Sequence, residues 1–199
     1  GTSKPLIADA DTGYGGLLNV RHTVRGYEAA GVQGVQIEDQ EMPKKCGHTP
    51  GRRVVPLADM LAKIEVAVDS RRSSDTLIVA RTDARSALGL DEAIRRGKAF
   101  AAAGADVVFV ESPESEDEFE RVGQEIDAPL LANMVPGSGS RSPMIAADTL
   151  KSWGFNIAIY PGMGLSVAAE ALRKAYMALL ENGDARGLDD DMWQDGTLH

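Results

Sequence analysis

Hydrophobic and polar positions follow two patterns that alternate along the chain. Short apolar runs end in a charged or amide side chain, and longer stretches between them carry apolar residues at helical spacing. Short runs with no polar alternation are typical of parallel strands buried on both faces. The predicted strands span 5–9, 34–38, 77–81, 107–111, 130–133 and 156–160, and the predicted helices span 19–30, 56–72, 90–103, 116–126, 146–153 and 165–181. This alternation predicts βα units that form a parallel sheet.

The polar residues at the strand ends favour one kind of parallel sheet. The strands end at Asp9, Glu38, Arg81, Glu111 and Asn133. A (β/α)8 barrel gathers its active site from many strand ends, whereas a doubly wound sheet uses one crevice. We therefore predict an α/β fold of the (β/α)8 TIM-barrel type.

The number of βα units also bears on the prediction of a (β/α)8 barrel. A closed barrel needs eight units, and six are visible, so we expect this sequence to lack about two N-terminal βα units. The predicted domains are a partial barrel over residues 1–182 and an acidic C-terminal tail over residues 183–199.

Composition narrows the classes of partner. The net charge of -9 over 199 residues and the lack of a basic stripe argue against binding to nucleic acid. No apolar run approaches the length of a membrane span. One cysteine cannot form an internal disulfide, so a cytoplasmic location is the default. We predict a small-molecule substrate, with neither a nucleic acid nor a membrane as partner.

The segment Asp9-Ala10-Asp11 is a candidate metal site. Side chains at positions i and i+2 of a strand point the same way, so both carboxylates would face one ion. Hard carboxylate oxygens suit Mg²⁺, which keeps waters and shares oxygens with the substrate. Glu38 would orient the waters on the metal. The alternatives are that one Asp caps a helix while the other is solvated, and that Glu38 is a loop or helix cap.

Cys46 is the second candidate, because its neighbours are unusual for a buried thiol. Lys44, Lys45, Gly47 and His48 surround it, and this is the composition of a loop. The lysines favour the thiolate, or a thiol with an accessible proton. Such a loop over an acidic pocket could attract an anionic substrate and exclude water on closing. The alternative is that Cys46 is a small buried hydrophobic residue.

Arg81 is the third candidate, because it ends a strand that is otherwise apolar. Its guanidinium suits bidentate recognition of a carboxylate. The alternative is a structural ion pair with an acid on a neighbouring strand. Glu111 and Asn133 complete a ring of polar strand ends.

Together these segments resemble the isocitrate lyase/phosphoenolpyruvate mutase superfamily, most closely the branch of 2-methylisocitrate lyase, dimethylmalate lyase, petal death protein and carboxyphosphonoenolpyruvate phosphonomutase. The segments that carry the resemblance are Asp9 to Gly15, Ile37 to Gln40, Lys44 to His48, Ala80 to Ala84, Phe109 to Glu111 and Leu131 to Asn133.

The resemblance implies a role for each candidate residue. It implies Mg²⁺, with Mn²⁺ as an alternative, at Asp9 and Asp11 with Glu38 behind it. It also implies a homotetramer whose C-terminal helix is exchanged between subunits. The residues implied to be catalytic are Lys44, Cys46, His48, Arg81 and Glu111, and those implied to bind substrate are Gly47, Arg81, Glu111 and Asn133.

The implied function is Mg²⁺-dependent cleavage of a carbon–carbon bond in a small 2-hydroxy or 2-oxo diacid. An enolate-like intermediate forms, and Cys46 is the acid/base on a gating loop. The substrate is a di- or tricarboxylate of the 2-alkylmalate, methylisocitrate or oxaloacetate type. Ser166 stands where methylisocitrate lyases carry an arginine, which favours the smaller diacids. Two alternatives stay open, a phosphonomutase that forms carbon–phosphorus bonds and an incomplete, non-catalytic fragment.

Overall fold

The computed structural model describes residues 3–46, 49–137, 140–188 and 192. The chain divides into two compact units, Gly1–Tyr160 and Pro161–His199.

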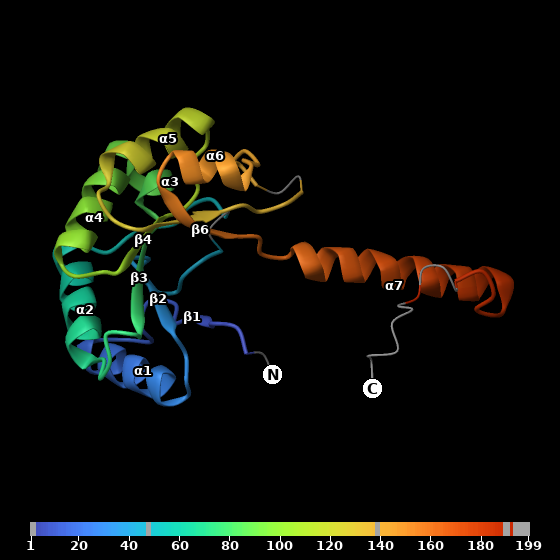
Figure 1. Cartoon of the computed structure of the whole chain (residues 1–199), viewed down its shortest axis with the longest axis horizontal. Coiled ribbons are helices and arrows are strands. Elements are labelled where there is room, and N and C mark those ends of the chain that lie inside the picture. Colours follow the sequence, from blue (N-terminus) through green and yellow to red (C-terminus); the bar gives the residue numbers. More distant parts are fainter. Residues whose placement is uncertain (1–2, 47–48, 138–139, 189–191, 193–199) are drawn as a thin grey trace. The chain divides into compact units, whose positions relative to one another are not determined.

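The first unit contains one six-stranded sheet (Figure 1). All neighbouring strands are parallel, and their spatial order is the sequence order, β1 to β6. The sequential order is that of a TIM-type barrel wall, whereas a doubly wound sheet reverses its order at a switch point. The strands are β1 (Ile7–Asp9), β2 (Gly34–Glu38), β3 (Leu77–Thr82), β4 (Val107–Val110), β5 (Leu130–Asn133) and β6 (Phe155–Ile159), so the six predicted strands are confirmed.

Helices follow the strands as the pattern predicts, and Figure 1 shows α1, α2, α4 and α5 along one side of the sheet. The unpredicted helix, α3, is too short to show a helical period. The first unit's helices are α1 (Leu17–Ala29), α2 (Leu57–Ser70), α3 (Ala84–Leu88), α4 (Leu90–Ala102), α5 (Glu116–Glu125) and α6 (Ala147–Ser152).

The two faces of the sheet bury different clusters of side chains. Ile78 and Ala80 of β3 pack into the larger core together with Phe100 of α4. Val79 points to the other face, where it forms a smaller cluster with Val107, Phe109 and Leu131. Because side chains alternate along a strand, the predicted site residues Arg81, Glu111 and Asn133 share the parity of this second cluster. Strand periodicity therefore places them on one face of the sheet.

The second unit is built around α7 (Met163–Asn182), which contains no buried residue. Within the described part of the chain, no helix is long and apolar enough to cross a membrane.

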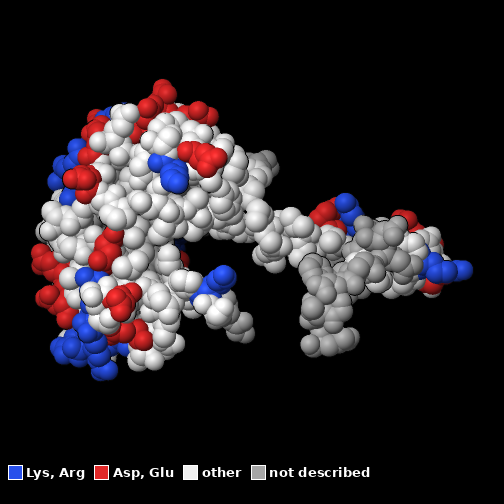
Figure 2. All heavy atoms as spheres, viewed as in Figure 1, with Lys and Arg blue, Asp and Glu red and all other residues white. Residues whose placement is uncertain are grey.

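Figure 2 shows acidic and basic side chains interspersed over the helices on the left of the view. Ion pairs such as Arg121–Asp91 and Lys98–Glu125 account for part of this mixture.

Candidate active site

Three charged side chains and one amide, at four adjacent strand ends, contact one another in a row. Arg81 lies opposite Glu38 in the register of β2 and β3, and its Nε is 3.6 Å from Glu38 Oε2. Its Nη1 is 3.5 Å from Glu111 Oε2, just beyond β4. Asn133 of β5 donates from Nδ2 to the same Glu111 oxygen at 3.2 Å. The strand ends thus form one continuous polar row, as the sequence pattern predicts.

The three predicted metal-binding carboxylates surround the ammonium group of Lys44. Lys44 Nζ is 3.9 Å from Asp9 Oδ2 and 3.5 Å from Glu38 Oε1, and it makes a close ion pair with Asp11. Lys44 comes from the loop that follows β2, so the loop reaches over the end of β1. The structure brings the predicted metal residues and Lys44 to one place.

Asp9 and Asp11 converge for a different reason from the one that the sequence suggested. Strand β1 ends at Asp9, and Asp11 has a left-handed φ of 50°. The Asp11 backbone N–H donates to Asp9 Oδ1 at 2.8 Å. A tight turn therefore places the two carboxylates, and the prediction that both lie on one strand is wrong.

Burial and neighbouring charges shift the pKa values of these groups. Burial raises the pKa of Glu38 to about 7, although the positive charges of Arg81 and Lys44 oppose the rise. For Lys44, burial lowers the pKa, but the hydrogen bond to Asp11 and the charge of Glu38 outweigh it, so the pKa is raised. Burial likewise opposes a raised pKa at Arg81, where Glu111 and Asp83 dominate. Lys44 and Arg81 are therefore firmly cationic.

The site has features that suit a divalent cation. Three carboxylates already face one positive charge, and within the described part of the chain the buried Glu38 Oε2 has no hydrogen-bond partner. Carboxylate oxygens are the donors that Mg²⁺ prefers. Among the described residues, no group of three His, Cys, Asp or Glu side chains is arranged to hold a metal, and Lys44 lies between the carboxylates. The oxygen atoms of Asp9, Asp11 and Glu38 are of the type that Mg²⁺ prefers, but in this structure they are arranged around the Lys44 ammonium group and not around a metal position.

The candidate thiol lies on the same loop as Lys44. Cys46 is exposed, so the alternative that it is a buried hydrophobic residue is wrong. Its carbonyl accepts a hydrogen bond from the backbone N–H of Thr49 at 2.9 Å. Gly47 and His48, which were predicted to bind substrate and to assist catalysis, lie outside the described residues.

Asp83 is a charged neighbour of the site that the sequence reading did not identify. It accepts two hydrogen bonds from Arg81, each at 2.9 Å, and a further one from Arg52. The structural ion pair considered for Arg81 is therefore present: Arg81 pairs with Glu38 and Glu111 at the neighbouring strand ends and, at a shorter distance, with Asp83 two residues along its own segment. The spacing Arg81-Thr82-Asp83 was the available signal.

Asp39 is a second buried acid that the sequence reading passed over. Its carboxylate accepts from Thr82 Oγ1 at 2.7 Å, from the Asp83 backbone N–H at 2.9 Å and from Arg96 at 2.9 Å. Burial raises its pKa, and these hydrogen bonds oppose the rise. Asp39 thus ties the end of β2 to the end of β3.

A sequential parallel sheet with charged residues gathered at its strand ends defines a barrel-type α/β protein. The chain belongs to the phosphoenolpyruvate phosphomutase family, whose model matches residues 1–180. It is 48% identical over 188 residues to 2,3-dimethylmalate lyase of Eubacterium barkeri, covering 94% of this chain and 64% of the relative. It is 42% identical over 187 residues to 2-methylisocitrate lyase of Bacillus subtilis (strain 168), covering 94% of this chain and 61% of the relative.

Solved structures agree with this assignment. The crystal structure of 2,3-dimethylmalate lyase, a PEP mutase/isocitrate lyase superfamily member, matches with a TM-score of 0.87 and 40% identity. That match covers 96% of this chain and 64% of the other. Phosphonopyruvate hydrolase in complex with oxalate and Mg²⁺ matches with a TM-score of 0.82 and 30% identity, over 97% and 66% of the two chains. The superfamily and the barrel-type fold class predicted from the motifs are confirmed, and this chain spans less than two thirds of the length of its first relatives.

Proposed function

We propose that this chain belongs to a Mg²⁺-dependent lyase that cleaves a carbon–carbon bond in a small 2-hydroxy or 2-oxo diacid. The observation that carries the proposal is the convergence at the strand ends. Lys44 meets three carboxylates there, and an exposed thiol follows two residues later on the same loop. The curated relatives include a dimethylmalate lyase and a methylisocitrate lyase, which supports a lyase acting on such acids.

Substrate binding is assigned to the polar row on β3 to β5. Arg81 supplies a buried, permanently charged guanidinium that can pair with a substrate carboxylate. The buried Oδ1 of Asn133 has no hydrogen-bond partner among the described residues, and it can accept a hydrogen bond from a substrate hydroxyl. Glu111 holds both side chains in place through its contacts with them. These groups suit a compact diacid better than a large apolar substrate.

The bond cleavage proposed is a retro-aldol reaction. In a 2-hydroxy acid, a carboxylate of the site accepts the proton of the 2-hydroxyl group, and a carbon–oxygen double bond forms as the bond between C2 and C3 breaks. A 2-oxo acid first adds water at C2, and the resulting diol supplies the hydroxyl group for the same step. The electron pair passes to C3 and its carboxylate, and Arg81 and Lys44 stabilise this charge as it develops. The Cys46 thiol then donates its proton to C3, which completes the second product. The exposed loop position of Cys46 suits a donor that approaches after substrate binds.

Mg²⁺ would be held by Asp9 and Asp11, with Glu38 adjacent. When bound, it would neutralise negative charge on the substrate oxygens. The oxalate and Mg²⁺ complex of phosphonopyruvate hydrolase supports this choice of metal. Mn²⁺, which has similar oxygen preferences, is the alternative.

For the whole protein we propose a cytoplasmic homotetramer with an exchanged C-terminal helix, in which residues 1–182 serve catalysis and 183–199 form a tail. The single cysteine supports a reducing compartment. The exposed apolar side chains of α7 support an assembly contact.

The lyase proposal is tested by supplying candidate acids to the purified protein with Mg²⁺. We expect pyruvate or glyoxylate from 2-alkylmalates or methylisocitrate, or acetate and oxalate from oxaloacetate, and we expect chelation of the metal to stop turnover. Complete absence of these products, together with no thermal stabilisation by Mg²⁺ and oxalate, would contradict it and would favour an inert fragment.

A second candidate is a phosphonomutase, because the matching family model is that of phosphoenolpyruvate phosphomutase. A mutase would move phosphorus between oxygen and carbon without releasing a keto acid. Phosphorus NMR of a carboxyphosphonoenolpyruvate-type substrate separates the two activities. A new carbon–phosphorus resonance without carbon–carbon cleavage would favour the mutase.

A further inference from the structure

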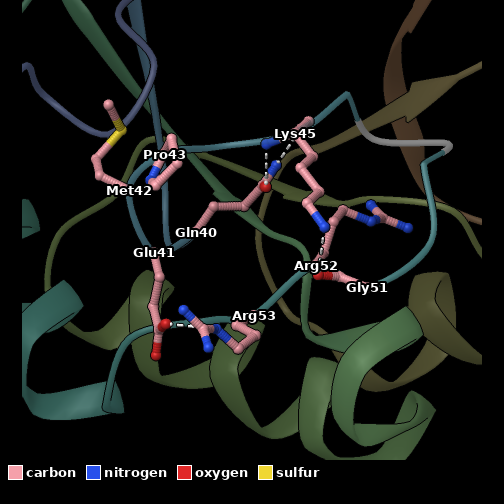
Figure 3. Close-up of a pocket in the computed structure, with 8 residues that line it drawn as sticks. All are labelled: Gln40, Glu41, Met42, Pro43, Lys45, Gly51, Arg52 and Arg53. Atoms are coloured by element: carbon pink, nitrogen blue, oxygen red, sulfur yellow. Dashed lines mark hydrogen bonds and ion pairs between the residues drawn. The ribbon is translucent and has the colours of Figure 1, made fainter.

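Gln40 links the candidate site directly to the loop that carries Cys46. It lies two residues beyond the end of β2, and only 2% of its surface is exposed. Its Nε2 donates to Glu38 Oε1 at 3.0 Å and to the carbonyl of Lys45 at 2.9 Å. Its Oε1 accepts from the backbone N–H of Lys45 at 3.0 Å. Figure 3 shows the two bonds between the Gln40 amide and Lys45.

The side-chain amide of Gln40 therefore pairs with Lys45 as a peptide group would. The side-chain N–H of Gln40 faces the Lys45 carbonyl, and the side-chain oxygen of Gln40 faces the Lys45 backbone N–H. Opposite residues of antiparallel strands exchange the same pair of hydrogen bonds. The second amide hydrogen is used by Glu38. The backbone of Gln40 also forms an antiparallel bridge with Val54, where the loop returns. One residue thus connects the start of the loop, its return and the site carboxylate.

The hydrogen bonds between Gln40 and Lys45 fix the part of the loop that carries Lys44 and Cys46. Lys44 and Cys46 are the two neighbours of Lys45, so the position of the Lys45 backbone sets the starting point of both side chains. Lys44 Nζ lies 3.5 Å from Glu38 Oε1, the same oxygen that accepts from Gln40. Glu38 is therefore the common anchor for the backbone and the side chain of this segment.

The two arms of the loop are not packed against each other along their whole length. A cavity of about 280 Å³ separates its two arms, and its lining includes Gln40, Pro43, Lys45 and Arg52 (Figure 3). The Lys45 ammonium group crosses the loop to donate to the Gly51 carbonyl at 3.2 Å, but this bond joins two parts of the same loop. Among the described contacts, the bond from Gln40 to Glu38 and the ion pairs of Lys44 connect residues 44–46 to the strand ends, whereas the returning arm of the loop is held separately by Arg52, which pairs with Asp83.

We propose that Gln40 is a positioning residue that latches the Lys44–Cys46 segment onto Glu38 and so sets the position from which the Cys46 thiol approaches the site. The proposal rests on the lyase function proposed above. Gln40 acts through Lys45 and Glu38 and does not itself touch the substrate. Loss of the latch should leave the strand-end groups that bind substrate in place and impair the step that needs Cys46.

The test compares Gln40→Met and Gln40→Asn with Glu41→Gln. Met matches the size of Gln without its hydrogen bonds, and Asn is one methylene too short to span both partners. Glu41→Gln is the matched control, because it removes an ion pair with Arg53 at the base of the same loop. Amide hydrogen exchange at Lys45 is measured first, since it reports loop position without any need for turnover.

We expect exchange at Lys45 to be roughly tenfold to hundredfold faster in both Gln40 variants, because its acceptor is lost. We expect kcat to fall roughly tenfold to hundredfold with KM and oxalate binding changed less than about threefold. The control should keep the wild-type values of exchange at Lys45, kcat, KM and oxalate binding. Unchanged exchange at Lys45 overturns the latch, and faster exchange with unaltered kcat overturns its role in positioning the thiol. If the wild type itself cleaves none of the acids, the lyase proposal fails, whereas the exchange experiment still decides whether the latch exists.

Discussion

At the scale of single residues, the exposed thiol is the most direct test of the proposed chemistry. Cys46→Ala should lower kcat by roughly 10²- to 10⁴-fold, the contribution usual for a positioned proton donor. Oxalate affinity measured by calorimetry with Mg²⁺ should change less than about threefold, because Arg81 and the carboxylates remain. Met42→Ala changes another exposed side chain of the same loop and should keep wild-type kcat. Full turnover by Cys46→Ala would remove the thiol from the mechanism.

Glu118 gives a second residue-scale prediction, which concerns stability against pH. Burial raises its pKa, but hydrogen bonds from Arg85 at 2.8 and 2.5 Å and from the Glu114 backbone at 2.8 Å outweigh burial, so the pKa is lowered. A carboxyl with a depressed folded-state pKa contributes stability above its unfolded pKa, and this contribution disappears as pH falls through the folded value.

Glu118→Gln should therefore be less stable than the wild type at pH 7, and the difference should shrink below about pH 4. Urea denaturation at several pH values between 7 and 3 measures this difference in the free energy of unfolding. Glu65→Gln removes the same charge from an exposed site on α2 and should show a small difference at either pH. A difference for Glu118→Gln that stays constant down to pH 3 would refute the assignment of the stability to this ionised carboxylate.

At the scale of elements, α5 approaches the end of α6 so closely that a side chain has no room. A Cβ built on Gly123 would lie 1.8 Å from the backbone oxygen of Trp153, which must move if Gly123 becomes Ala. We expect Gly123→Ala to lower the free energy of unfolding by about 1–3 kcal/mol. A Cβ built on Gly26 of α1 meets no described atom within 4 Å, so Gly26→Ala should raise the free energy of unfolding by about 0.5–1 kcal/mol. Urea denaturation measures the free energy of unfolding of both variants. Equal changes for Gly123→Ala and Gly26→Ala would contradict the close packing of α5 against the end of α6.

The elements also show what the sequence could and could not predict. Short apolar runs with polar ends located all six strands, because burial on both faces and function at the strand ends leave a clear pattern. Helix α3 was missed because five residues carry no period. The spacing of Asp83 from Arg81 was a local signal, but the bond of Asp83 to Arg52 and the bond of Gln40 to Lys45 depend on the path of the loop, which local spacing does not reveal. The convergence of Lys44 with Asp11 likewise depends on the path of the loop.

At the scale of the whole molecule, α7 exposes a stripe of apolar side chains along one helix. Leu165, Leu172 and Leu179 recur every seven residues, and all three are exposed in this chain. Apolar area left in water forgoes about 25 cal/mol per Å², so a stripe of this length favours a partner surface. The proposed homotetramer with an exchanged C-terminal helix supplies that surface from a second copy.

Leu172→Glu should therefore shift the purified protein from tetramer toward smaller species, because the introduced carboxylate would be buried without a partner at the contact. Lys174→Gln makes the same change in net charge two residues away, and it should leave the assembly unaltered if the apolar stripe forms the contact. Light scattering coupled to size exclusion, run at several protein concentrations, measures the mass of each species. A monomeric wild type would contradict the proposed homotetramer, and identical masses for the wild type and Leu172→Glu would place the subunit contact elsewhere. Dissociation by Lys174→Gln to the same extent would mean that charge, and not the apolar stripe, controls the assembly.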